Sequence, residues 1–178
     1  MGGNWKANGS SAQTAQWLSV LNSGKTAAST EVVVAPPHPY LADVRARLRR
    51  DFAVASQDAF ASTGAHTGEV SASMLKDLGL KYAILGHSER RQKGETNELI
   101  AAKTTAAIDN GLTVIACLGE TLAERDAGRT IDVVTSQLAV RGRRRRRRAA
   151  ASVPMAHRAQ PLPLTLARHR RPPPPSSH

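Results

Sequence analysis

This sequence is poor in cysteine and has neither a long apolar run nor a secretory leader. Its 178 residues include one cysteine, Cys117, so no disulfide framework can form within the chain, and a reducing compartment is indicated. No apolar run approaches the roughly 20 residues that are needed to cross a bilayer, and Met1–Asn4 does not begin a signal peptide. We therefore expect a cytoplasmic protein with no membrane partner.

Acidic residues are missing from the C-terminal part of the chain. Residues 1–139 hold all 14 Asp and Glu and 14 of the 25 Lys and Arg, so their formal charge is zero, whereas 140–178 hold the other 11 Arg. The strongly basic character of the protein therefore belongs to 140–178 alone. Because this segment has few large apolar side chains to offset its ordering entropy, the sequence predicts a domain over 1–139 and a disordered Arg/Pro/Ala-rich tail over 140–178.

Two interpretations of the tail remain open. Arg, Pro and Ala all have GC-rich codons, so an out-of-frame translation would produce this composition, and we favour that interpretation. The alternative is a nucleic-acid-binding arm, because an arginine run such as Arg143–Arg148 binds phosphate backbones without sequence preference. Nucleic acid is not the partner that we expect.

Apolar strands alternate with amphipathic helices over 1–139. This alternation predicts a parallel sheet covered by helices, and by itself it allows either a doubly wound sheet or a barrel. No GxGxxG motif follows a strand, which disfavours a dinucleotide-binding fold. The sequence predicts strands at 1–6, 31–35, 52–56, 82–85 and 112–118, and helices at 10–21, 40–50, 71–78, 96–110 and 120–138, the last with a break at Gly128.

The stretch Tyr82–Arg91, which reads YAILGHSERR, presents an imidazole at the end of a buried strand. Gly86 permits a sharp turn after the strand, and Ser88 and Glu89 suit the first turn of a helix, where their side chains can accept backbone N–H groups. His87 is therefore expected at the carboxyl end of a parallel strand, where ligands bind in α/β proteins. Without further context, His87 could equally be a packed side chain or a helix cap with no catalytic role.

Five separated segments together resemble the triose-phosphate isomerase family. The resemblance covers about 1–139 and implies an α/β fold, a partial TIM (β/α)8 barrel with about five βα units, where the whole barrel has eight. We expect the first strand to be truncated, because the residues that would complete it upstream are absent. The segments are GGNWK at 2–6, VVVAPP at 32–37, GAHTGE at 64–69, LGHSERR at 85–91 and IACLGETLAERDAG at 115–128.

The resemblance implies an isomerase that interconverts dihydroxyacetone phosphate and D-glyceraldehyde 3-phosphate by enediolate proton transfer, in glycolysis and gluconeogenesis. It assigns His87 as the electrophile and Lys6 as the catalytic and substrate-binding cation, with Asn4 as a further substrate contact. Ser88 and Glu89 are expected to be supporting residues that cap the helix after His87 and orient neighbouring groups. The resemblance implies no cofactor and no metal ion, and we assign no nucleophilic role to Cys117.

The same resemblance implies a homodimer, because the family's loop corresponding to Gly64–Glu69 enters the neighbouring subunit, with Thr67 reaching the partner's site. The sequence departs from the family pattern at His66, where an aromatic residue is common. It departs again at Gln92–Glu95, which is one residue short, and we expect a distorted loop there.

The largest departure is that no general base is identifiable: the family's glutamate on the sixth strand has no counterpart after Leu138. We therefore expect a fragment of the isomerase with little activity, because the proton transfer lacks its base. The alternative is a non-enzymatic truncated product whose arginine-rich tail binds nucleic acid non-specifically.

Overall fold

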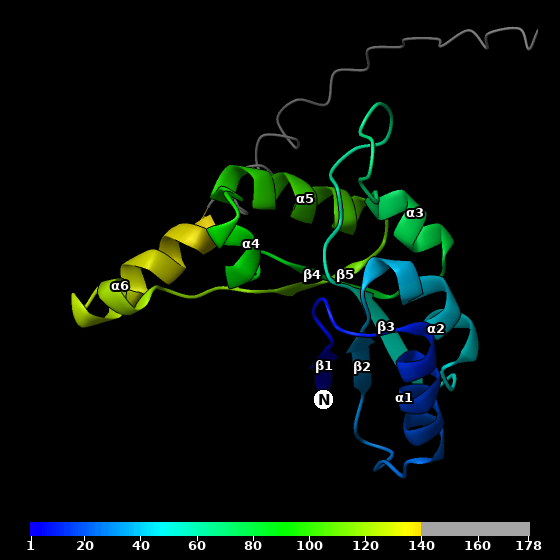
Figure 1. The fold of residues 1–178 in the computed structure, drawn as a ribbon. Helices are drawn as coiled ribbons and strands as arrows, with labels where there is room; N and C mark the ends of the chain where they lie inside the picture. The colour runs from blue at the N-terminus through cyan, green and yellow to red at the C-terminus, as the bar shows by residue number, and fades with distance from the viewer. Residues whose placement is uncertain (140–178) are drawn as a thin grey trace, which may run out of the picture.

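Five parallel strands form one curved sheet in the computed structural model, which describes residues 1–139. The strands follow one another across the sheet in chain order, and each crossover contains helical structure (Figure 1). This arrangement confirms the predicted partial barrel, while the predicted tail lies outside the described residues. The strands are β1 (Gly2–Asn4), β2 (Val32–Ala35), β3 (Phe52–Ser56), β4 (Tyr82–Leu85) and β5 (Thr113–Ala116).

The helices begin at the side chains that the sequence offers as caps. Ser10, Ser71, Thr96 and Thr121 each accept a hydrogen bond from the backbone N–H three residues later, which satisfies one of the free donors of the first turn. No helix within 1–139 is long and apolar enough to span a membrane. The helices are α1 (Ser11–Ser23), η1 (His38–Tyr40), α2 (Leu41–Arg47), α3 (Ala72–Asp77), α4 (Ser88–Gln92), α5 (Asn97–Asp109), α6 (Leu122–Asp126) and a further helical segment, 130–139.

The prediction for α2 was wrong at its C-terminal end, because tertiary hydrogen bonds stop the helix before Arg50. The amide of Asn22 donates to the carbonyl oxygen of Arg47 and accepts from the backbone N–H of Arg49. The Arg49 guanidinium also pairs with Asp51 at 2.7 Å. These contacts satisfy backbone groups that another helical turn would otherwise have used, and the helix ends at Arg47.

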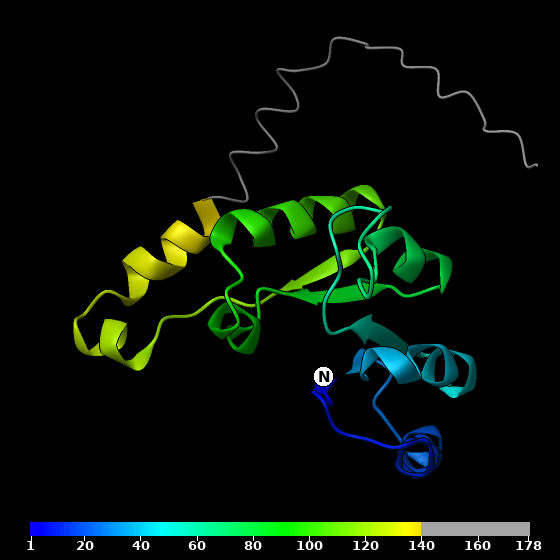
Figure 2. The same ribbon diagram turned by 45° about the horizontal axis from the view of Figure 1, so that its top comes forward.

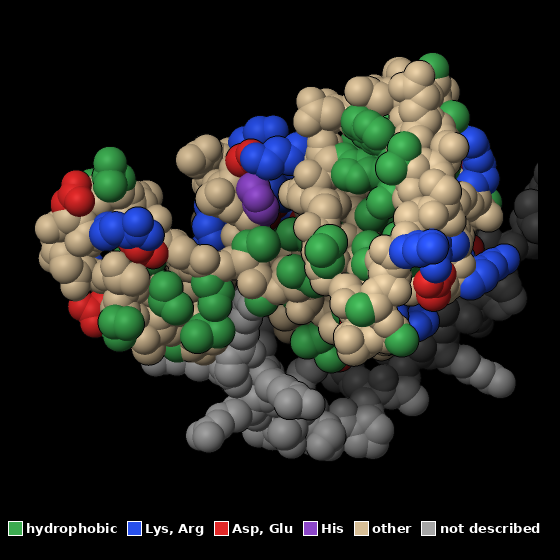
Figure 3. Space-filling model, turned by 90° about the horizontal axis from the view of Figure 1, so that it is seen from below, with side chains coloured by type: hydrophobic (Ala, Val, Ile, Leu, Met, Phe, Trp, Pro, Cys, Tyr) green, Lys and Arg blue, Asp and Glu red, His purple; other side chains and the backbone are tan. Residues whose placement is uncertain are grey.

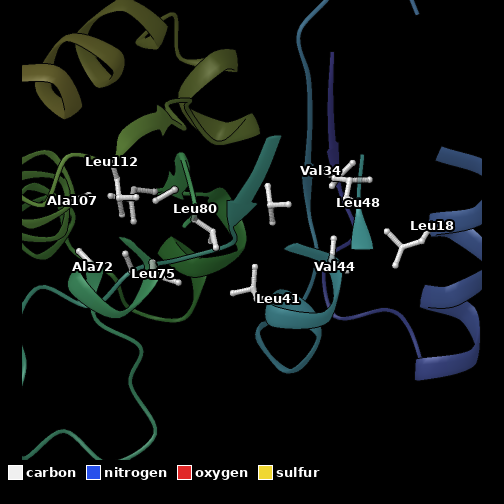
Figure 4. Close-up of a cluster of buried hydrophobic side chains, with 14 residues drawn as sticks. Leu18, Val34, Leu41, Val44, Leu48, Ala72, Leu75, Leu80, Ala107 and Leu112 are labelled. Carbon is white, nitrogen blue, oxygen red and sulfur yellow. The ribbon is translucent and has the colours of Figure 1, made fainter. Parts of the chain in front are cut away.

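The main hydrophobic core lies between the sheet and its covering helices (Figure 4). Alternate strand residues supply the sheet side of this core, as the two-residue repeat of a strand requires. The opposite face of the sheet carries a smaller cluster built on Ala35, Ala55 and Ile84, with Cys117 packed against it. The main cluster contains Leu18, Val34, Leu41, Val44, Leu48, Val54, Ala59, Ala72, Leu75, Leu80, Ala83, Leu85, Ala107 and Leu112.

Candidate active site

His87 stands at the carboxyl end of β4, as predicted. Gly86 turns the chain there with φ +78°, and a Cβ atom on it would lie 3.1 Å from the carbonyl oxygen of Cys117, so both the backbone angle and the space require glycine. Arg91 secures the turn because its Nε donates to the Gly86 carbonyl at 2.9 Å. The strand-to-helix turn therefore holds the imidazole in one place.

His87 itself is the N-cap of α4, so the expectation that Ser88 caps this helix was wrong. The Nδ1 atom of His87 accepts the backbone N–H of Glu89 at 3.3 Å. An imidazole nitrogen that accepts a hydrogen bond carries a lone pair, so the neutral ring has its hydrogen on Nε2. Nε2 is therefore the atom that can donate to a ligand.

The predicted strand over 1–6 is too long at its C-terminal end, because β1 ends at Asn4 and Lys6 lies beyond it. Strand alternation therefore does not direct the Lys6 side chain. Its backbone is left-handed, with φ +54°, which is uncommon outside glycine. Two contacts hold this conformation: the Lys6 N–H donates to Asn4 Oδ1 at 2.9 Å, and Gln57 Nε2 donates to the Lys6 carbonyl at 2.8 Å. The same Gln57 nitrogen donates to the Ala35 carbonyl at 2.9 Å, so Gln57 ties the Lys6 turn to β2.

Lys6 and Glu89 form an ion pair across the mouth of the sheet, with Nζ 2.6 Å from Oε1. Both side chains are half-exposed, and Glu89 Oε2 lies 3.6 Å from His87 Nδ1. The hydrogen bond from Lys6 lowers the pKa of the Glu89 carboxyl. The structure therefore brings Asn4, Lys6, His87 and Glu89 together, although β1 and β4 are separated in the sheet by two strands.

This arrangement offers a cation and a neutral N–H donor at one edge of the sheet. Lys6 can attract an anionic group, and His87 Nε2–H can donate to an oxygen atom that gains negative charge. Because Glu89 occupies Lys6 Nζ, an anionic ligand must compete with it or share the ammonium hydrogens. Within 1–139 no group of three or more His, Cys, Asp or Glu side chains is placed to hold a metal ion.

A buried network of charges that sequence reasoning missed lies behind the site. Lys103 on α5 is 2% exposed, and its Nζ donates to Glu95 and to Asp58 Oδ2, the latter at 2.7 Å. Arg90 on α4 pairs with the same two carboxylates, at 2.8 Å to Asp58 and 2.6 Å to Glu95. The network joins the segment after β3 to α4 and α5, and so holds in place the helix that His87 caps.

The two carboxyls of this network differ in their electrostatics. Burial raises the pKa of Asp58 by more than its hydrogen bond from Lys103 lowers it. Burial also pushes the pKa of Glu95 upward, but hydrogen bonds from Lys103 and Arg90 together outweigh burial and lower it. One signal in the sequence could have found the network: Lys103 lies on the helix face of Ile100 and Ala107, where a lysine needs a buried partner.

The loop after α4 is closed rather than distorted, which corrects our expectation for Gln92–Glu95. The N–H groups of Lys93 and Glu95 both donate to the carbonyl of Arg90, and Gly94 takes φ +97°. This short turn places the Glu95 carboxylate against Lys103 in the buried network.

Thr67 lies on the long loop between β3 and α3, which projects from the sheet in Figure 1. His66, the residue that departs from the family pattern, stays on its own loop: its ring is 4.6 Å from that of Phe60, and its Nε2 is 3.0 Å from Ser62 Oγ. The loop is therefore internally braced at His66, and Thr67 is not among the residues gathered around Lys6.

Comparison with known proteins identifies the family. The model described as triosephosphate isomerase matches residues 1–156. The chain belongs to the triosephosphate isomerase family. Its relatives include the cytosolic triosephosphate isomerase of Oryza sativa subsp. japonica, 48% identical over 141 residues, which cover 77% of this chain and 56% of the relative. The triosephosphate isomerase of Yarrowia lipolytica is 50% identical over 141 residues, 78% of this chain and 57% of the relative.

Membership of the triosephosphate isomerase family confirms the resemblance stated from the sequence motifs. The alignments with the two relatives extend over about as many residues as the structure describes, while the family match continues to residue 156. The chain spans about half the length of the curated relatives that it matches.

We predict that Gly86→Ala destabilises the fold by about 2 kcal/mol or more, because it adds a side chain to a left-handed backbone and a tight space. The measurement is the free energy of unfolding in urea. Gly119→Ala is the matched control, since nothing lies within 4 Å of a Cβ there. Equal stability of the two variants would contradict the requirement for glycine at position 86.

We predict that Lys103→Met costs about 3–5 kcal/mol, because it leaves two buried carboxylates with Arg90 as their remaining cation. Urea unfolding measures the loss, and Lys25→Met, a change at an exposed lysine, should stay within about 0.5 kcal/mol of the parent. If Lys103→Met proved as stable as that control, the network would not hold α4 in place.

We predict that the pKa of Glu89 lies below the ordinary value for glutamate, because the hydrogen bond from Lys6 stabilises the carboxylate. The ion pair between Lys6 and Glu89 therefore persists at a pH above the pKa of Glu89. It is lost as the pH falls through this lowered pKa and the carboxylate is protonated. In Lys6→Met the Glu89 midpoint should rise toward the ordinary value for glutamate, and Lys25→Met should leave it unchanged. Carboxyl ¹³C shifts followed by NMR give both midpoints, and an unshifted midpoint in Lys6→Met would argue against the pair.

Proposed function

We infer that this site binds a triose phosphate and takes part in the aldose–ketose isomerisation for which the family is named. The observation that carries the proposal is the convergence of Lys6, Glu89 and His87, from segments 83 residues apart, at the carboxyl ends of parallel strands. Family membership supports the substrate class. Dihydroxyacetone phosphate and D-glyceraldehyde 3-phosphate are the proposed substrates, with no cofactor and no metal ion.

The residues divide the work by their chemistry. Lys6 supplies positive charge to the phosphate and to the oxygen that becomes negative, with Asn4 as a neighbouring polar contact. His87 donates Nε2–H to the carbonyl oxygen and stabilises the enediolate without changing its own charge. Glu89 orients the Lys6 ammonium while no ligand is bound.

The proton transfer between carbon atoms needs a general base. Among the described residues the only carboxylate in contact with the site is Glu89, which is paired with Lys6. We therefore propose that this chain binds and polarises the substrate, with turnover far below that of a site that contains a base.

Two further statements about the family context belong to this proposal. We propose a homodimer in which Thr67 reaches the partner's site, because its loop extends away from its own sheet (Figure 1). We also propose a cytoplasmic location, which the name of the cytosolic rice relative supports.

A second candidate function rests on the 11 arginines and the absence of acidic residues after residue 139. Such a segment would bind nucleic acid through phosphate contacts, with an affinity that falls steeply as salt is added. This function would need neither Lys6 nor His87.

The test compares ligand binding and turnover in three variants of the full chain. Titration with dihydroxyacetone phosphate, followed by NMR, should show binding that Lys6→Met weakens about tenfold or more and that Lys25→Met leaves unchanged. His87→Gln should retain phosphate binding but reduce any measurable isomerisation by about 100-fold.

Two results would overturn the proposed site. One is the absence of binding at millimolar ligand, and the other is binding that does not respond to Lys6→Met. Binding of unrelated DNA that is lost when 140–178 are deleted, together with either of those results, would favour the second function.

A further inference from the structure

The two residues that follow the central strand β3, Gln57 and Asp58, contact both sides of the candidate site. Strand β3 lies between β2 and β4 in the sheet. On the side of β2, the Gln57 amide donates to the Lys6 carbonyl at 2.8 Å. On the side of β4, the Asp58 carboxylate contacts side chains of α4 and α5. One dipeptide therefore connects the turn that carries Lys6 with the helix that His87 caps.

Asp58 is the member of the buried network that comes from a distant part of the chain. Arg90, Glu95 and Lys103 belong to one stretch, 90–103, and the pairs among them close that stretch on itself. Asp58 adds the pairs that reach β3, since its Oδ2 lies 2.8 Å from Arg90 Nη2 and 2.7 Å from Lys103 Nζ. Without Asp58 the network would still hold α4 against α5, but it would join neither helix to the sheet.

Among the described residues, two ion pairs join α4 to parts of the chain that precede β4, and they differ in exposure. The pair between Glu89 and Lys6 is half-exposed, like the basic and acidic side chains that lie side by side at the surface in Figure 3. Exposed pairs contribute little to stability. The Asp58 side chain is 6% exposed, and breaking a buried, charged contact is costly. Asp58 therefore has the larger influence on where α4 lies, beside the start of α5 in Figures 1 and 2.

We propose that Asp58 is a positioning residue, which sets the place of His87 relative to Lys6. It acts through its buried ion pairs with Arg90 and Lys103 and touches no ligand itself. The link from Arg90 to the imidazole is short, because the Arg90 N–H donates to the His87 carbonyl at 2.9 Å. A displacement of Arg90 therefore displaces His87 as well.

The separation between Lys6 and His87 matters for a ligand that contacts both. This role rests on the proposed function, in which Lys6 attracts the phosphate and His87 Nε2–H donates to the carbonyl oxygen of the same molecule. A misplacement of about 1 Å is enough to weaken the contact with His87. Inorganic phosphate needs Lys6 alone. The ratio of the two affinities therefore reports the placement of His87 and is insensitive to the strength of Lys6.

The experiment replaces Asp58 by asparagine in the full chain, with circular dichroism as the check of the fold. Asp58→Asn keeps the shape of the side chain and removes its charge, so the contacts with Arg90 and Lys103 lose their charge assistance. NMR titration should show that dihydroxyacetone phosphate binds about fivefold more weakly, while inorganic phosphate stays within about twofold of the parent chain. Asp77→Asn, at an exposed aspartate, is the matched control and should change neither affinity.

A second readout needs no ligand. Nuclear Overhauser contacts between the side chains of Lys6 and Glu89, whose charged atoms are 2.6 Å apart, report the distance between the Lys6 turn and α4. At neutral pH, Asp58→Asn should weaken these contacts, and Asp77→Asn should leave them as they are in the parent chain. A residue that only stabilised the fold would lower the free energy of unfolding and leave both readouts unchanged.

Arg90→Lys tests the same connection if Asp58→Asn does not fold. The Arg90 side chain is 38% exposed, so its replacement disturbs the interior less. Its guanidinium contacts Asp58 through Nη2 and Glu95 through Nε, and a single ammonium group cannot reproduce this geometry. We expect Arg90→Lys to change the affinity ratio in the same direction, with Arg50→Lys, at an exposed arginine, as its control.

The outcomes separate this proposal from the proposed function. If the parent chain binds both ligands and the affinity ratio of the variants matches that of the controls, the positioning role is overturned, whatever the change in stability. If the parent chain binds neither ligand, the proposed function fails, and the contacts between Lys6 and Glu89 decide. Weakened contacts would then support a positioning role for Asp58, and unchanged contacts would overturn it.

Discussion

The ion pair between Lys6 and Glu89 is the contact on which the candidate site depends. It can form only if the sheet curves, because β2 and β3 lie between β1 and β4. A flat sheet would hold the ends of β1 and β4 three strand spacings apart. The pair in turn aligns the ammonium of Lys6 with the imidazole of His87. The five-stranded half-barrel is therefore enough to place the cation Lys6 beside the hydrogen-bond donor His87.

Behind that contact, the buried charges of Asp58, Arg90, Glu95 and Lys103 give α4 a defined place. A network of this kind adds little net stability compared with apolar packing, since burying each ion carries a large desolvation cost. What it provides is direction: each hydrogen bond joins one particular pair of atoms, whereas apolar contacts allow sliding. Because His87 is the N-cap of α4, the network sets the position of the imidazole without touching a ligand.

The open sheet places a different demand on the molecule. A parallel sheet normally has both faces covered and its edges paired, and here the helices cover one face while β1 and β5 each keep one edge unpaired within the described residues. An exposed flank of α1 lies beside the end of β1.

The sequence by itself determined the order and kind of the elements. Strand β3 matches its predicted residues, the helix break occurs at Gly128 as predicted, and His87 stands after β4, because apolar periodicity, glycine and capping side chains act over a few residues. Tertiary structure decided the rest. The end of α2 at Arg47, the left-handed Lys6 and the partners of Lys103 all depend on groups tens of residues away along the chain. Such contacts leave no local periodic pattern, so only the folded structure reveals which residues meet.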